Sequence, residues 1–236
     1  MAMKTVSIIA QKGGSGKTTL CRHLAVGAQQ VGLSTVIIDT DPQGGARDWG
    51  EIRGRSPDVV SELSPNPTYL EKAIRRCEAS GVEILFVDTP GHNNPISVNA
   101  AGFSDLVLVP VRPTPDDLNA LWQTIKTLMD RKVPYFAVLS QCPTTTRRPR
   151  LEALAALAKN RVPVCEIVIH QKGVVPASAV TGETALEMDG LTESEAKTVE
   201  EFQGLVMWLC DRLGLQIREQ YRNKATAQHG KEVIKQ

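Results

Sequence analysis

The sequence is poor in aromatic residues and has no closely spaced pair of cysteines. Aromatic residues make up only 4% of it, whereas Ala, Val, Leu and Ile are plentiful, which favours buried parallel strands with covering helices over an all-β sandwich. An odd number of cysteines without a C-x-x-C motif argues against a zinc or iron-sulfur site within one chain, and for free thiols in a reducing compartment. The five cysteines are Cys21, Cys77, Cys142, Cys165 and Cys210.

Long apolar segments are also missing. No stretch approaches the roughly 20 apolar residues that a membrane-spanning helix needs. The apolar run within residues 1–14 is too short and too soon interrupted to be a secretory signal peptide. A cytoplasmic location is therefore predicted.

An excess of charge of one sign is missing as well, because 27 Lys and Arg nearly balance 26 Asp and Glu and the net charge is only +1. This value argues against a molecule that binds polyanions over its whole surface. The charge is nevertheless uneven, since residues 212–236 contain six Lys or Arg and two Glu, which leaves the rest of the chain slightly acidic. Such a basic end fits contacts with phosphates or anionic lipid, and it fits a solvated terminal face equally well.

What the sequence does contain is a regular alternation of short β-branched runs and segments with apolar residues at helical spacing. This alternation predicts an α/β fold, with a doubly wound, mostly parallel sheet and helices on both faces. We expect one domain over residues 1–214 and a basic helix or tail of the same domain at 215–236. Strands are predicted at 4–10, 34–41, 82–88, 105–111, 134–140 and 162–170, and helices at 17–31, 67–80, 114–130 and 191–214.

A glycine-rich turn, "QKGGSGKTT", separates the first predicted strand from the first predicted helix. The usual phosphate-loop motif, G-x-x-x-x-G-K-[ST], requires glycine where this chain has Gln11, and a second lysine, Lys12, follows directly. Backbone N–H groups of such a turn, together with the positive end of the helix, bind phosphate oxygens. In this motif Lys17 bridges the β- and γ-phosphates and the Thr18 hydroxyl ligates Mg²⁺.

Residues 12–19 resemble the deviant phosphate loop, K-G-G-x-G-K-[ST], of the ParA and MinD group of P-loop ATPases. The stretch "DTDPQGG" at 39–45 is similar to the D-x-D-P-Q-G element of ParA-type partition ATPases. The resemblance continues through "ILFVDTPG" at 84–91 as the Walker B strand, "SDLVLVPVRPTPDDL" at 104–118 and "ASAVTGETALEMD" at 177–189. No helix-turn-helix precedes Lys4, as in the short ParA forms.

The resemblance implies a site for ATP and Mg²⁺. In the family the first lysine of the loop, here Lys12, reaches across an ATP-bound dimer to the phosphates of the other subunit. Catalytic roles are thereby implied for Lys12, Lys17 and Asp41, with Asp41 positioning the attacking water. The implied nucleotide-binding residues are Lys12, Gly13, Gly14, Ser15, Gly16, Lys17, Thr18 and Thr19, and the implied magnesium residues are Thr18, Asp39 and Asp88.

Several features leave alternatives open. Either aspartate of "DTD" fits a cap on the loop after its strand, because Asp is a common turn residue. Ser15 replaces a small apolar residue of the family, and "TPGHNNP" departs from its usual second switch, where His92 fits a loop residue better than a general base. The resemblance puts adenine contacts near 141–144 and 171–176, where no base-specific motif is readable.

The implied function is a weak ATPase of plasmid or chromosome partition or cargo positioning. It would form a homodimer with ATP, bind DNA nonspecifically at the bacterial nucleoid, and be stimulated by a ParB-like partner. The basic candidates for DNA contact are Arg147, Arg148, Arg150 and the residues from Arg212 onward.

One alternative is a MinD-like membrane-cycling ATPase. It requires an amphipathic terminal helix, whereas the last residues offer only Tyr221, Val233 and Ile234 as bulky apolar side chains, so no stable membrane association is expected. A reductase like the nitrogenase iron protein, which needs cysteines facing across a dimer axis, is a more remote possibility.

Overall fold

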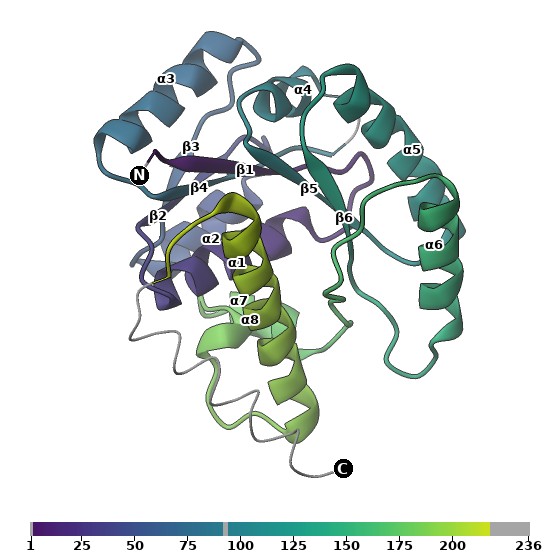
Figure 1. The fold of residues 1–236 in the computed structure, drawn as a ribbon. Helices are drawn as coiled ribbons and strands as arrows, with labels where there is room; N and C mark the ends of the chain where they lie inside the picture. Colours follow the sequence, from purple (N-terminus) through teal and green to yellow (C-terminus); the bar gives the residue numbers. More distant parts are fainter. Residues whose placement is uncertain (1, 92–93, 218–236) are drawn as a thin grey trace.

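The computed structural model describes residues 2–91 and 94–217, and its centre is a six-stranded, all-parallel sheet (Figure 1). The strand order is β3-β2-β4-β1-β5-β6, so each strand is joined to the next through a crossover or an intervening helix. The parallel α/β architecture predicted from the sequence is thus confirmed. The strands are β1 Lys4–Ile8, β2 Thr35–Asp39, β3 Asp58–Ser61, β4 Ile84–Asp88, β5 Leu106–Val111 and β6 Tyr135–Leu139.

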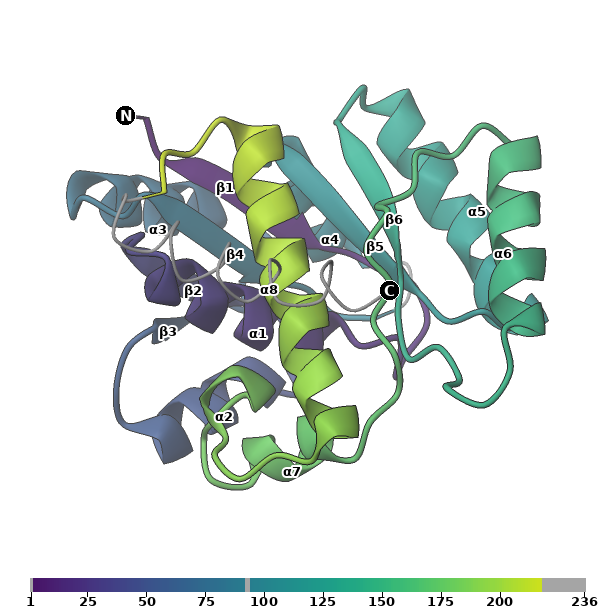
Figure 2. The ribbon, with the colours of Figure 1, turned by 60° about the horizontal axis from the view of Figure 1, so that its bottom comes forward.

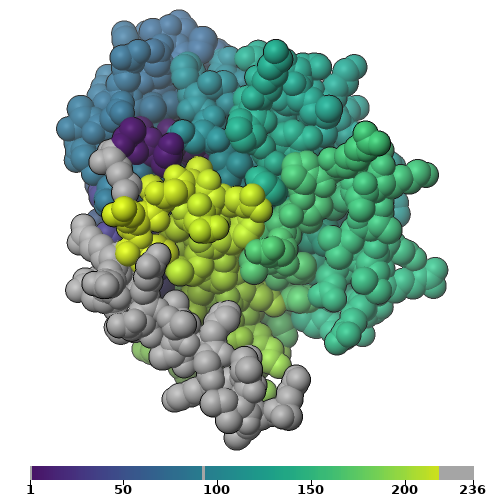
Figure 3. Space-filling view, in the orientation of Figure 1, coloured from purple at the N-terminus to yellow at the C-terminus, as the bar shows by residue number. Residues whose placement is uncertain are grey.

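Helices cover both faces of the sheet, as Figures 1 and 2 show. Helices α1 (Lys17–Gln30) and α8 (Glu193–Leu213) pack on one face, and on this side the outer surface of α8 is visible in Figure 3. The opposite face carries α3 (Pro67–Ala79), α4 (Pro95–Gly102), α5 (Pro115–Asp130) and α6 (Arg148–Lys159). The remaining helices are α2 (Gly45–Arg53), α7 (Val174–Ala179) and the 3₁₀ turn η1 (Ala185–Glu187).

Alternating strand residues divide the core between the two faces. Val6 and Ile8 of β1 point toward α1 and α8, whereas Ile9, just after the strand, packs with α5. Phe202 of α8 is fully buried in the first layer, where it stacks on the ring of His23 with centroids 4.0 Å apart. The near-continuous apolar runs of β4 and β5 follow from this arrangement, because both of their faces are covered.

Helix ends lie where the sequence predicts them. Asn66 and Thr114 cap α3 and α5 by accepting the backbone N–H of Thr68 (3.0 Å) and Asp117 (3.3 Å). At the C-terminal end of α8, Gly214 adopts a left-handed φ of 64° and terminates the helix.

The predicted strand at 162–170 is wrong. Only two isolated parallel bridges link this segment to β6 and the residues after it, at Ala137–Val164 and Cys142–His170. The N–H of Cys165 donates to the Ala137 carbonyl and that of Ile169 to the Leu139 carbonyl. Between these two hydrogen bonds the segment advances by four residues, whereas β6 advances by two. The extra residues prevent a continuous ladder of hydrogen bonds.

Several elements were not predicted, namely β3, α2, α4, α6 and α7. Helix α6 contains Arg148 and Arg150, two of the basic candidates for DNA contact. Of the basic C-terminal set, Arg212 lies in α8 with its guanidinium 4.9 Å from the ring centroid of Phe136, and the residues from 218 onward are outside the described residues.

Within the described part of the chain, we find no helix with both the length and the apolarity that crossing a bilayer requires.

We predict that the α1–α8 layer dominates stability. Phe202→Ala should lower the free energy of unfolding by about 3–5 kcal/mol, because it empties a buried aromatic site. Leu151→Ala on α6, where the side chain is 57% exposed, should change it by less than about 0.5 kcal/mol. Urea denaturation of both variants measures the difference, and equal losses would contradict this assignment of the core.

Candidate nucleotide and magnesium site

The candidate site lies at the carboxyl edge of the sheet. Strand pairing puts Asp88 at the end of β4 in register with Ile8 of β1 on one side and with Asp39 of β2 on the other. Two carboxylates thus lie on neighbouring strands directly beside the loop that leaves β1. In open parallel sheets this edge is where ligands bind.

Donors from the end of β6 hold the glycine-rich loop. The Ser140 hydroxyl donates to the Ser15 carbonyl (3.0 Å), and the Gln141 amide donates to the Gly14 carbonyl (2.9 Å). Gly16 has φ of 95°, and a Cβ there would lie 3.2 Å from the Gln141 amide nitrogen. The loop therefore needs glycine for its backbone conformation and is fixed before any ligand binds.

The loop forms one wall of a cleft of about 510 Å³. A second cleft, of about 450 Å³, adjoins it and shares Gly16, Thr19 and Gln141. The first cleft is lined by Gly13, Gly14, Gly16, Lys17, Thr18, Thr19, Asp41, Pro42, Gln43, Pro90, Gly91, Asn94 and Gln141. The structure thus brings most of the predicted loop residues and Asp41 together around one space.

Lys17 is the cation of this cleft. Burial lowers the pKa of its ammonium group, and the nearby charges of Asp88 and Asp41 partly oppose that effect. Gly91, in the segment after β4, lies against the same amine, since a Cβ on it would be 3.6 Å from the Lys17 Nζ. The ammonium is thus enclosed by backbone and carboxylates, a suitable arrangement for an anionic ligand.

Asp88 has the most demanding environment of the site. It is completely buried, and neither carboxylate oxygen has a hydrogen bond of ordinary geometry to a described residue, although the Thr18 hydroxyl lies close enough to lower its pKa. Burial, the largest effect, raises the pKa of Asp88 to about 7. Buried carboxylates normally have partners, so this one fits a bound cation or its water shell.

Asp39 has a different role from Asp88 in the structure. Its carboxylate accepts three backbone N–H groups, from Asp41 (2.9 Å), Ala46 (3.0 Å) and Arg47 (2.8 Å). Burial raises its pKa, and these hydrogen bonds oppose the increase. Asp39 therefore fixes the start of α2, which corresponds to the capping alternative from the sequence, and its magnesium role stays a prediction.

Asp41 is half-buried at the mouth of the cleft. Its carboxylate accepts the N–H of Gln43 at 3.0 Å, and its carbonyl accepts that of Gly44 at 2.8 Å. This tight turn aims the segment 41–45 at the phosphate loop, because a Cβ on Gly45 would touch the Thr18 side chain at 3.4 Å.

Lys12 and Ser15 do not line the cleft, unlike the rest of the loop. The Lys12 ammonium is 2.5 Å from Asp117 at the start of α5. The Ser15 hydroxyl is buried and has no hydrogen-bond partner among residues 2–91 and 94–217. His92 lies outside the described residues.

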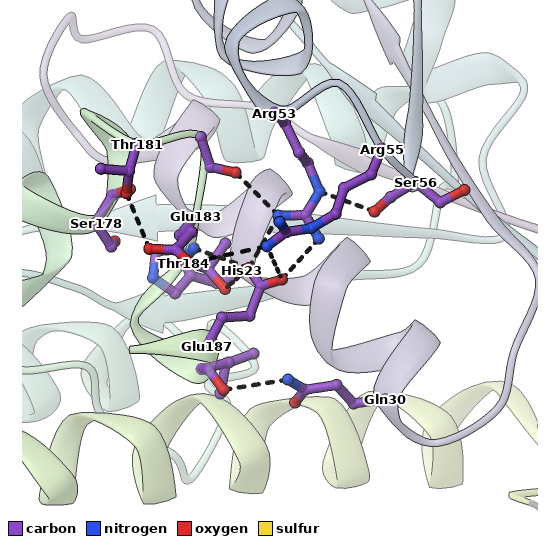
Figure 4. A network of polar contacts seen from close by, with 12 residues as sticks. His23, Gln30, Arg53, Arg55, Ser56, Ser178, Thr181, Glu183, Thr184 and Glu187 are labelled. Carbon is purple, nitrogen blue, oxygen red and sulfur yellow. Dashed lines mark hydrogen bonds and ion pairs between the residues drawn. The ribbon is translucent and has the colours of Figure 1, made fainter. Parts of the chain in front are cut away.

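A polar network behind the site was missed by the sequence analysis (Figure 4). Arg53, at the end of α2, makes a bidentate pair with Glu187 (2.7 and 2.9 Å) and donates to the Gly182 carbonyl (2.9 Å). Trp49 donates to the Glu183 carbonyl at 3.1 Å. The network joins α2 to residues 182–187, and the signal for it was the late "TGETALE" stretch, whose acidic residues need a cation.

His23 extends this network into α1. Its Nδ1 lies 2.8 Å from the Thr19 carbonyl, and its Nε2 accepts the N–H of Ala185 at 3.1 Å. The second bond requires an unprotonated Nε2, so the ring is neutral with its proton on Nδ1. Burial lowers the pKa of His23 to about 3, consistent with a structural role.

The residues present fit a magnesium ion. No three His, Cys, Asp or Glu side chains gather into a metal cage in the described part of the chain. Mg²⁺ does not need such a cage, because it keeps several waters and binds through one or two carboxylates plus substrate phosphates. The unpartnered oxygens of Asp88 and the adjacent Thr18 hydroxyl are the donors that such an ion would use.

We predict opposite effects for the same substitution at two neighbouring aspartates, measured without nucleotide or metal. Asp88→Asn should raise the free energy of unfolding at pH 8, because it removes a buried charge whose burial outweighs the compensation by Lys17 and Thr18. Asp39→Asn should lower it by about 1–3 kcal/mol, because an amide nitrogen would face backbone N–H groups.

The pH dependence gives a second test of the Asp88 environment. Its folded pKa lies above the unfolded value, so the contribution of Asp88 to stability should fall as pH rises from about 4 to about 7, and the advantage of Asp88→Asn should grow over that interval. Denaturant titrations at pH 5 and pH 8 measure this change. An advantage that does not depend on pH would contradict the assignment.

Comparisons with known proteins identify chains that are similar in sequence over most of their length. Protein ParA of Rhizobium radiobacter is 23% identical over 219 residues, which cover 89% of this chain and 98% of that protein. Maintenance of carboxysome distribution protein A of Halothiobacillus neapolitanus is 24% identical over 204 residues, covering 84% of this chain and 93% of its own. Both relatives match this chain over most of their length.

A solved structure shares the fold. The Cyanothece McdA–ATP complex superposes with a TM-score of 0.72 at 16% identity, covering 92% of this chain and 98% of its own. The sequence profile of the CobQ/CobB/MinD/ParA nucleotide binding domain matches residues 6–235. Since that match spans nearly all of the sequence, the protein belongs to the CobQ/CobB/MinD/ParA nucleotide-binding family.

Proposed function

We propose that this protein is an ATPase that dimerises when it binds ATP and uses the dimer to position DNA or another cargo. One observation carries the proposal: the glycines of the phosphate loop, Lys17, Thr18 and Asp41 line one cleft beside Asp88, whose carboxylate has no ordinary hydrogen bond to a described residue. The likeness of this chain to ParA and to a carboxysome distribution protein supports the choice of cargo positioning.

In this proposal the chain's own groups bind and orient the nucleotide. The amides of the loop and the Lys17 ammonium bind the β- and γ-phosphates. Thr18 and Asp88 hold Mg²⁺, with Asp39 acting through water, and the ion supplies neutralisation of phosphate charge. Asp41 orients the attacking water, and the intrinsic hydrolysis is weak.

The adjoining cleft is the proposed site of the adenine. It lies beside the phosphate loop, and its lining includes Gln141 and residues 171–173, inside the segments expected from the sequence. His170 also lines it, with its ring held by Glu201 at 2.6 Å.

Lys12 is the residue proposed to act across the dimer. Its ammonium lies on the α5 side of the loop and outside the cleft of its own chain. A cation in that position is available to a second copy, in which it would offset the phosphate charge brought into the interface.

DNA is the proposed surface for the dimer, at the bacterial nucleoid. Arg147, Arg148 and Arg150 lie at the start of α6, and Arg148 pairs with Glu152 at 2.7 Å on the exposed side of that helix. Contacts of this kind bind phosphates without reading sequence. A ParB-like protein is the proposed stimulator of hydrolysis, and the functional domain is proposed to span residues 1–214.

We predict a separation of roles between two loop residues. Lys12→Ala should keep nucleotide binding but lose dimer formation with a nonhydrolysable ATP analogue, whereas Asp41→Ala should dimerise and hydrolyse ATP about 100-fold more slowly. Lys126→Ala, an exposed lysine of α5, is the matched control. Light scattering and phosphate release measure the two properties, and normal turnover by Asp41→Ala would refute its role.

We also predict retention on nonspecific duplex DNA with ATP but not with ADP, weakening steeply as salt increases. Replacing Arg147, Arg148 and Arg150 by Ala should reduce the salt slope by about one per lost phosphate contact. Replacing Arg75 and Arg76 of α3 should leave it unchanged. Retention on anionic liposomes instead of DNA would favour the membrane-cycling alternative.

A further inference from the structure

A buried carboxylate binds the first lysine of the phosphate loop. Asp117, with a side chain only 2% exposed, lies 2.5 Å from the Lys12 ammonium and accepts two hydrogen bonds from Arg112, at 2.6 and 3.0 Å. Neither Asp117 nor Arg112 lines the nucleotide cleft. The proposed function assigns no task to this pair.

The carboxylate is well compensated. Although burial alone would raise the pKa of Asp117, the hydrogen bonds and charges of Arg112 and Lys12 keep it below its usual value. Asp117 also lies in the first turn of α5, where the helix dipole favours a negative charge. Two cations and a helix end therefore stabilise one charge.

Because Asp117 has more than one positive partner, its contact with Lys12 can be lost without leaving the carboxylate unpaired. Removing the only partner of a buried charge is strongly unfavourable, but Asp117 keeps its bidentate bond to Arg112 if Lys12 leaves. Lys12 itself is about one-third exposed, so its side chain has room to move without unpacking the core. Departure of this ammonium would therefore leave Asp117 paired with Arg112.

We propose that Asp117 is a positioning residue that restrains Lys12 beside α5 in the single chain, while Arg112 keeps Asp117 paired when Lys12 moves to the second subunit. This inference rests on the proposed ATP-dependent dimer. It makes the strength of the Lys12–Asp117 contact a determinant of the protein concentration at which dimers form.

The first test reads the contact in the nucleotide-free chain and does not depend on dimers. The reactivity of Lys12 toward an amine-acylating reagent is measured by mass spectrometry. Asp117→Asn should increase it about tenfold, since a hydrogen bond to a charged group is worth roughly that factor or more. Asp116→Asn is the matched control, because Asp116 is 87% exposed and 3.9 Å from the amine. Unchanged low labelling of buried Lys17 shows that the loop stays folded.

The second test uses opposite shifts. With a nonhydrolysable ATP analogue and Mg²⁺, Asp117→Asn should lower the protein concentration for half-dimerisation. Arg112→Gln should raise it, because Asp117 then depends on Lys12 alone. A merely structural role would shift both variants in the same direction, which would overturn the proposal.

The outcomes separate this inference from the proposed function. Equal Lys12 labelling in wild type and Asp117→Asn overturns the restraint, whatever the oligomeric state. If labelling changes but all variants stay single with saturating analogue, the dimer of the proposed function fails, and with it the link between restraint and assembly. Altered labelling together with opposite dimerisation shifts supports the full proposal.

Discussion

The structure depends on the concentration of negative charge at one edge of the sheet. Parallel pairing puts the ends of β2 and β4 in register, which forces Asp39 and Asp88 into the same buried region. Two carboxylates cannot both remain charged there without compensation. The chain compensates Asp39 with three backbone N–H groups but leaves Asp88 to the Lys17 charge and the Thr18 hydroxyl. The buried negative charge therefore lowers the stability of the folded chain. It also makes the site suitable for a cation and phosphates.

The elements around the cleft are connected to distant parts of the chain. Residues after β6 hold the loop carbonyls, Asp39 holds the start of α2, and Glu187 holds its end. The segment 41–45 lies between the fixed start of α2 and the phosphate loop. The segment 41–45 is thus connected through α2 to residues 182–187, and Figure 4 shows the contacts of Arg53 with Glu187 at the C-terminal end of that helix.

Much of the fold was predictable because local signals agreed with the tertiary structure. The Asn66 and Thr114 caps, the Gly214 stop and the apolar strands all act within a few residues. The failure at 162–170 has a different origin, because its β-branched pattern does not reveal that the segment is two residues too long to pair with β6. Helix α2 was missed because its first turn is stabilised by Asp39, which precedes the helix by several residues.

The candidate site likewise contains residues that were predictable from the local sequence and contacts that were not. Contiguous motifs identified the loop, Lys17 and the strand-end aspartates, since their spacing follows from strand and turn geometry. The Asp117 contact with Lys12 and the Arg53–Glu187 pair were not predictable, as more than 100 residues separate the partners in each case. Only the assembled fold shows that Asp39 caps a helix, while its neighbour Asp88 has no ordinary hydrogen-bond partner within residues 2–91 and 94–217.

The pairing of Arg53 with Glu187 also constrains the order in which the chain folds during its synthesis. While the ribosome is still making the chain, the Arg53 guanidinium and the Trp49 indole emerge long before the carbonyls and the carboxylate that bind them. Until residues 182–187 have left the exit tunnel, the C-terminal part of α2 lacks the partners of Trp49 and Arg53. Vectorial synthesis thus delays the anchoring of α2 until residues 182–187 have been made.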